Sequence, residues 1–157
     1  MVYQIDQSGK VEDTSSLTIV AVANGKTKTL KIAGREKRKA ILVLRKQDYP
    51  KKVFIYKLFA ALIYLLLKGE KISEVIIDKE YPGHEATIKL ILVNFYRKFQ
   101  KLSPQIHFME ITKNSPAHKI AIETYRGKIK PDMVVNSEEV LILFKSNKKG
   151  WRSRVRR

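Results

Sequence analysis

The chain has 157 residues, 44% of them hydrophobic, with five Pro and seven Gly, a composition that predicts one folded domain with a sizeable core. It has no cysteine, which excludes disulfide bonds, a thiolate nucleophile and cysteine-bound zinc. Its 32 Lys and Arg against 15 Asp and Glu give a net charge of +17. This surplus favours a polyanionic partner. We expect DNA or RNA and not a membrane, with a generally basic surface as the alternative.

The first part of the chain predicts three antiparallel strands, at residues 2–6, 17–23 and 26–33. Asn24-Gly25 separates the last two and is a strong hairpin signal, because both positions tolerate positive φ. The start of the chain lacks the long apolar core of a secretory signal, so we expect a cytoplasmic protein.

The longest apolar run covers residues 53–67 and predicts a buried central helix. It is shorter than the roughly 20 residues that a membrane span needs and it contains Lys57. A helix that dimerises is the alternative, so a homodimer stays open. Before it, residues 39–45 (KAILVLR) could form a strand or the first turns of a helix, and we favour a strand.

After this helix, strands and helices alternate. Strands are expected at residues 73–78 and 105–111, helices at 84–102 and 116–125, and a hairpin of two short runs at 130–135 and 138–144. The fold class is therefore α/β, with a mixed five-stranded sheet of three antiparallel and then parallel strands flanked by helices. Residues 1–144 form the domain, and residues 145–157 form a basic C-terminal tail.

The order of these elements resembles that of the ribonuclease H-like superfamily, in which three antiparallel strands precede parallel strands alternating with helices. Asp6, followed by Ser8 and Gly9, is similar to the Asp-x-Ser-Gly start of that family. Asp78 lies at the end of the fourth predicted strand, where the family has its second acid. Residues 53–67 lack the acid that ribonuclease H itself carries in its first helix, so the chain is more similar to the resolvase, Piwi and transposase branches.

This resemblance implies phosphodiester chemistry with Mg²⁺ or Mn²⁺, held by carboxylate oxygens. Asp6 would bridge the metal ions, Asp78 would flank it, and Glu80 is an accessory ligand candidate. The third main ligand stays open between His118, Glu123 and Asp132 of the late part of the chain. His118 could also act as a general base, which makes Asp6, Asp78 and His118 the catalytic candidates.

Basic residues form two candidate contacts for nucleic acid, one at residues 35–38 and one in the tail. There Lys and Arg would neutralise phosphates and Trp would stack on a base. The residues are Arg35, Lys37, Arg38, Lys148, Lys149, Trp151, Arg152, Arg154, Arg156 and Arg157. No Gly-rich phosphate loop, HExxH or GxSxG motif is present, which leaves kinase, dinucleotide-binding and serine-hydrolase functions without support. A metal-dependent nuclease or nucleotidyl transferase is the first hypothesis; a non-catalytic DNA- or RNA-binding module or a ribonucleoprotein subunit is the alternative.

Overall fold

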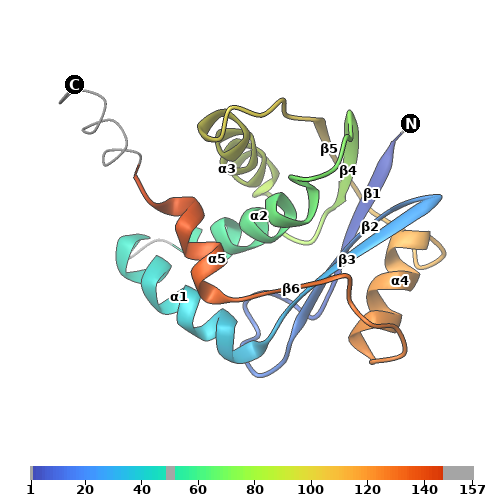
Figure 1. The fold of residues 1–157 in the computed structure, drawn as a ribbon, viewed down its shortest axis with the longest axis horizontal. Coiled ribbons are helices and arrows are strands. Elements are labelled where there is room, and N and C mark those ends of the chain that lie inside the picture. The colour runs from blue at the N-terminus through green and yellow to red at the C-terminus, as the bar shows by residue number, and fades with distance from the viewer. Residues whose placement is uncertain (1, 49–51, 147–157) are drawn as a thin grey trace.

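A mixed six-stranded sheet runs through the centre of the protein, in the spatial order β5-β4-β1-β2-β3-β6 (Figure 1). The computed structural model describes residues 2–48 and 52–146. The α/β class and the mixed sheet are confirmed, although the sheet has six strands where the sequence predicted five. The strands are β1 (Tyr3–Ser8), β2 (Thr18–Asn24), β3 (Lys26–Ile32), β4 (Glu74–Asp78), β5 (Gln105–Met109) and β6 (Met133–Val135).

The direction of the strands places the ends of β1 and β4 at the same edge of the sheet. β1, β2 and β3 pair antiparallel, whereas β4 pairs parallel with β1 and β5 pairs parallel with β4. In this register Ile5 lies opposite Ile77. Asp6 and Asp78, the next residue of each strand, therefore come side by side where the carboxyl ends of parallel strands meet.

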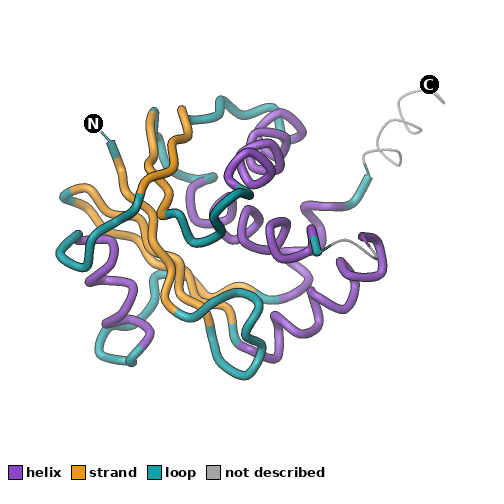
Figure 2. Tube along the Cα trace, turned by 180° about the vertical axis from the view of Figure 1, so that it is seen from behind, coloured by secondary structure: helices purple, strands orange, loops and turns teal. Residues whose placement is uncertain are grey.

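Helices cover both faces of the sheet, but unequally. One face carries α1 (Gly34–Asp48), α2 (Val53–Leu67), α3 (Glu85–Lys98), α5 (Ser137–Leu141) and the 3₁₀ helix η1 (Ile142–Phe144). The other carries α4 (Pro116–Tyr125) alone, as the view from behind makes clear (Figure 2). The site at the end of β1 and β4 therefore has α4 on one side and the larger helical layer on the other.

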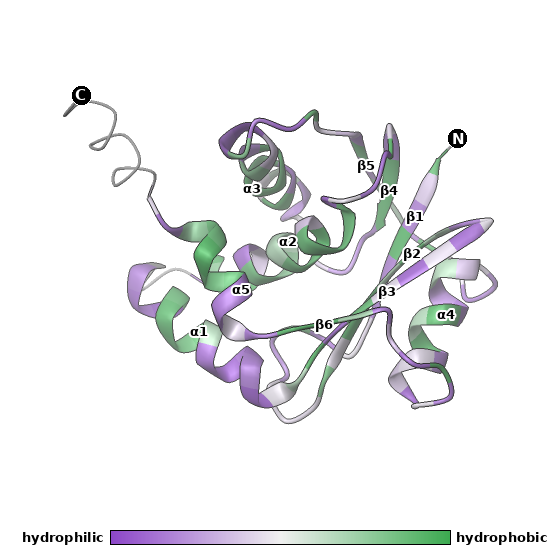
Figure 3. Cartoon of the chain, in the orientation of Figure 1, coloured by the Kyte–Doolittle hydropathy of each residue, from purple (hydrophilic) through white to green (hydrophobic). Residues whose placement is uncertain are grey.

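The helix α2 forms the middle of the main core. Residues 58–67 are all buried, which confirms the predicted central helix, and the helix is almost uniformly apolar (Figure 3). Its side chains pack with Ile5, Val20 and Leu30 from the sheet. Among the described residues, no helix has both the length and the apolar character needed to cross a membrane.

The helix α4 begins where the sequence predicts. The side chain of Ser115 accepts a hydrogen bond from the backbone N–H of His118, and Pro116 occupies the first turn. Ala121 of α4 packs against Ala21 and Ile19 of β2 in a small second core. Ala21 lies opposite Asp6 in the sheet, so Asp6 faces α4 and the start of that helix.

The prediction of a strand at residues 39–45 is wrong, because this stretch belongs to α1. Ala40, Ile41 and Leu44 are buried, whereas Leu42 and Val43 are exposed. Buried positions spaced one, three and four apart mark one face of a helix. The apolar run therefore reflects two adjoining sides of a helix and not the two covered faces of a strand.

The hairpin predicted around Asn136-Ser137 is also wrong. The first run forms β6, which pairs parallel with β3, and the second forms α5 and η1. Asn136 is the N-cap of α5: its side chain accepts from the N–H of Glu139, whose carboxylate accepts from the N–H of Asn136. This reciprocal capping box starts a helix where a turn was expected.

Candidate metal centre

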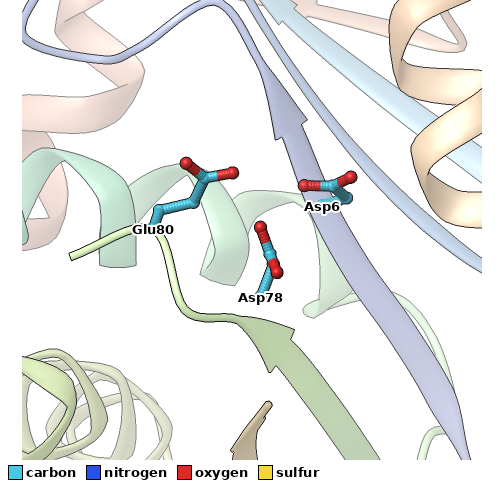
Figure 4. Close-up of side chains that lie close together, drawn as sticks. All are labelled: Asp6, Asp78 and Glu80. Carbon is cyan, nitrogen blue, oxygen red and sulfur yellow. The ribbon is translucent and has the colours of Figure 1, made fainter. Parts of the chain in front are cut away.

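Three carboxylates meet where β1 and β4 end. Asp6 lies in β1, Asp78 closes β4 and Glu80 follows in the next loop, and the three carboxyl groups point toward one another (Figure 4). One ligand atom from each lies within 4.8 Å of the others. Among the described residues these three form the group that could hold a metal ion. The parallel pairing of β1 with β4 brings together two aspartates that are far apart in the chain.

Backbone amides fix the two aspartates in place. Oδ1 of Asp6 accepts from the N–H of Gln7 at 2.8 Å, and Oδ1 of Asp78 accepts from the N–H of Ile111 at 2.7 Å. The N–H of Glu80 donates to the carbonyl of Asp78 at 2.8 Å, which turns the chain just after β4. These bonds position the two aspartate carboxylates through the backbone, so their arrangement does not depend on a bound ligand.

His118 joins the cluster through Asp6. Its Nδ1 lies 2.8 Å from Oδ2 of Asp6, and the His118 side chain is 31% exposed while that of Asp6 is 3% exposed. An ionised carboxylate can only accept, so Nδ1 carries the proton in this pair and Nε2 of a neutral ring is an acceptor. His118 therefore supports Asp6 directly and presents one basic nitrogen.

Burial and mutual repulsion make this group of acids unfavourable when all are ionised. Burial raises the pKa of Asp6, the hydrogen bond from His118 opposes this change, and the charge of Asp78 adds to it. Burial, followed by the hydrogen bond with Asp78 and the charge of Asp78, raises the pKa of Glu80 to about 8. The protonated form of Glu80 is therefore favoured when no cation neutralises the cluster.

The donor set fits a hard divalent cation. Carboxylate oxygens are the ligands that Mg²⁺ and Mn²⁺ prefer, whereas the described cluster offers no sulfur and its histidine is directed at Asp6. A cation between the carboxylates would neutralise the charges that raise the pKa of Glu80. The residues present are thus suited to bind a metal ion.

The other predicted ligands lie elsewhere. Glu123 is exposed towards the end of α4 and is not part of the cluster. Asp132 accepts from the backbone N–H of Thr29 at 2.8 Å and so links β3 to the segment before β6. The first helix of the fold is α1 and not residues 53–67; its Glu36 accepts from the N–H of Ser137 and does not join the acids of the site.

The basic residues predicted to bind nucleic acid are not equivalent. Lys37 is wholly buried, and its Nζ donates to the carbonyls of Lys10 and Asp13 and to Oγ1 of Thr18. The structure therefore removes Lys37 from the basic surface. Arg35 has a side chain that is 77% exposed. The candidates in the tail, from Lys148 to Arg157, lie outside the described residues.

Arg38 is exposed too, and Nη1 donates to the carbonyl of Thr14 at 2.8 Å. It therefore combines an exposed charge with a contact to the loop between β1 and β2.

Sequence reasoning missed Gln7 and Tyr81, which both contact residues of the site. The amide of Gln7 donates to the hydroxyl of Tyr81 at 3.2 Å. Gln7 follows Asp6 and Tyr81 follows Glu80, so adjacency to the predicted acids was the available signal. Neither residue type points to metal chemistry by itself.

Comparison of the sequence with protein-family models and with curated proteins finds no match.

Proposed function

We propose that this protein is a divalent-metal-dependent nuclease or nucleotidyl transferase with a ribonuclease H-like fold. The observation that carries the proposal is the meeting of Asp6, Asp78 and Glu80 within 4.8 Å, at the shared edge of two parallel strands. The resemblance to the ribonuclease H-like superfamily implies these positions for the two aspartates. The order of three antiparallel strands, then parallel strands and helices, supports the same assignment.

Each residue of the centre has a role that follows from its contacts. Asp6, whose two oxygens are oriented by the N–H of Gln7 and by Nδ1 of His118, would hold the metal together with Asp78 and Glu80; the resemblance implies the bridging role for Asp6. Bound Mg²⁺ or Mn²⁺ would supply activation of the attacking water and stabilisation of the leaving oxygen. Nε2 of His118 accepts a proton from the attacking group, while its Nδ1–H stays on Asp6.

The charge of the protein suits a nucleic-acid substrate. With +17 at neutral pH, the protein attracts a phosphate backbone from a distance and gains from counterion release on contact. Three of its 15 acidic residues gather at one edge of the sheet. A polyanion and a small cation can thus be held by different parts of one surface.

Substitution of Asp6 by Asn tests the proposal. The variant should lose Mg²⁺- or Mn²⁺-dependent cleavage of DNA or RNA and keep its affinity for the same oligonucleotides. Glu138→Gln is the matched control, because it makes the same change of charge at an exposed position of α5. Single-stranded, duplex, hybrid and branched substrates should all be assayed. Unchanged cleavage by Asp6→Asn would overturn the proposal.

A non-catalytic nucleic-acid-binding module is the second candidate. It is favoured by one observation: Nδ1 of His118 is engaged with Asp6, so His118 is not among the candidate ligands and the described cluster consists of three carboxylates. If the wild-type protein binds nucleic acid but cleaves none of these substrates with either metal, this second function replaces the first.

A further inference from the structure

A hydrogen-bonded chain leads from the surface to Gln7, and it includes Tyr81, the residue after Glu80. The hydroxyl of Tyr81 donates to Oε1 of Glu12 at 3.0 Å and accepts from Nε2 of Gln7 at 3.2 Å. Tyr81 directly follows Glu80 and Gln7 directly follows Asp6, so the bond between their side chains ties the loop that carries Glu80 to β1. Each polar group on this path has its direction set by the next one.

The buried side-chain amide of Gln7 has one polar atom without a hydrogen bond among the described residues, which is unfavourable for folding. Gln7 is 7% exposed, and its Oε1 is buried without a hydrogen-bond partner in the part of the chain that the structure describes. A buried acceptor in this condition is unfavourable and usually has an explanation in the site around it. Here the NH₂ group, which donates to the hydroxyl of Tyr81, is the part of the side chain that is used.

The ring of Tyr81 is fixed independently of its hydroxyl. It packs edge-on against Phe59 and Tyr56, with ring centroids 5.2 Å and 5.8 Å apart. This packing carries the ring into the core, so replacing Tyr81 by Phe removes the hydrogen bonds and keeps the apolar contacts. The contribution of the hydroxyl can therefore be measured by itself.

The loop that carries Glu12 is anchored by α1. Buried Lys37 donates to the carbonyls of Lys10 and Asp13, which flank Glu12, and to Oγ1 of Thr18. Oγ1 of Thr18 in turn donates to the carbonyl of Gly9 at 2.9 Å. An internal cation thus organises residues 9–17, and Glu12 is presented to Tyr81 from a fixed loop.

We propose that Gln7, Tyr81 and Glu12 are positioning residues that hold Glu80 against Asp6 and Asp78 in the geometry that binds the metal ion. This inference rests on the metal centre proposed above. Groups that orient metal ligands in this way typically change metal affinity by about 10- to 100-fold when they are removed. The path Glu12–Tyr81–Gln7 gives the loop that carries Glu80 a support that the sheet itself does not provide.

The test is a titration with Mn²⁺ alone, monitored by the electron paramagnetic resonance of the free ion, on the full chain. Tyr81→Phe should weaken Mn²⁺ binding by about tenfold or more. Tyr96→Phe is the matched control, since Tyr96 is a buried tyrosine that packs on Tyr64 and lines a hollow with Lys68. It should leave Mn²⁺ affinity unchanged. Denaturant unfolding of both variants separates a metal effect from a general loss of stability.

Substitutions of Glu12, which is exposed, test the positioning role independently of Tyr81. Glu12→Gln keeps an oxygen that accepts from Tyr81 and should retain Mn²⁺ affinity, whereas Glu12→Ala should reduce it. Wild-type affinity in Tyr81→Phe and in Glu12→Ala would overturn the positioning role while leaving the metal centre intact. If the wild-type protein binds no Mn²⁺, the proposed function fails and this inference fails with it.

Discussion

Nδ1 of His118 lies 2.8 Å from Oδ2 of Asp6, although the two residues are 112 positions apart in the chain. This hydrogen bond ties the first turn of α4 to the first strand of the sheet. Ser115 fixes the start of α4 by accepting from the N–H of His118, so the same residue is held through both its backbone and its ring. The late helix therefore completes the centre by supporting Asp6.

Substitutions of His118 separate its hydrogen bond to Asp6 from its proposed role as a general base. His118→Gln keeps an amide donor for Asp6, so Mn²⁺ affinity should change little. It lacks a basic nitrogen, so metal-dependent cleavage should fall by about 10²- to 10⁴-fold. His118→Ala should lower both quantities. Cleavage by His118→Gln at the wild-type rate would rule out the general-base role and leave His118 as a support for Asp6.

The metal-free protein should lose stability as the pH rises from about 5 to 8. Folding raises the pKa of Glu80 to about 8 from an ordinary value of 4.5, so within this window the folded state binds the proton and the unfolded state does not. The contribution of Glu80 is fully present below the unfolded pKa and disappears as the pH passes the folded pKa. Urea unfolding in EDTA at several pH values measures this contribution to the free energy of unfolding.

The control is Glu80→Gln, which cannot titrate and should show a flatter dependence on pH. The same proton competes with the metal ion, so wild-type Mn²⁺ affinity should increase by up to about tenfold per pH unit below pH 8. An unfolding free energy in EDTA with the same pH dependence in wild type and Glu80→Gln would contradict this assignment.

Lys37 and Arg35 should have opposite effects, although both were predicted to bind nucleic acid. Lys37→Met leaves three oxygens without their donor and should lower the free energy of unfolding by about 3 kcal/mol. Arg35→Ala removes an exposed charge, should change stability by less than about 0.5 kcal/mol, and should weaken nucleic-acid binding. Chemical denaturation and binding titrations at several salt concentrations distinguish the two. Equal loss of stability in both variants would contradict the structural role of Lys37.

Truncation after Ser146 tests the basic tail. It removes six Lys and Arg residues, and binding should weaken to a similar extent for every sequence. On duplex DNA, the dependence of log K on log salt should become less steep by about 0.9 for each phosphate that the tail neutralises in the full-length protein. A slope that does not change would remove the tail from the binding surface.

Local sequence signals predicted most of the fold. The Asn24-Gly25 turn, the Ser115-Pro116 helix start and the apolar run of residues 53–67 each specify their element through short-range chemistry, and each is observed. Residues 39–45 were misassigned because Leu42 and Val43 are exposed apolar residues, which hide a helical pattern inside an apolar run. Asn is common both in turns and at helix N-caps, so Asn136 alone did not distinguish the predicted hairpin from the capping box that it forms.

The candidate centre was predictable to the extent that it follows from strand ends. Asp6 and Asp78 are the last acids of two strands that pair in parallel, so their meeting follows from topology. The contacts of Gln7, Tyr81 and Lys37 depend instead on how loops close over the sheet. Lys37 lies three and four positions before Ala40 and Ile41, on the buried face of α1, so its burial could be foreseen only if residues 34–48 were recognised as a helix.

The most direct test of the metal centre is a crystal structure of the protein grown with Mn²⁺, with an anomalous difference map recorded at the manganese edge. We expect a peak between the carboxylates of Asp6 and Asp78, close to Glu80, and no such peak in Asp6→Asn crystals grown under the same conditions. A map with no peak at these carboxylates, or the same peak in Asp6→Asn, would contradict the assignment of this cluster as the metal centre.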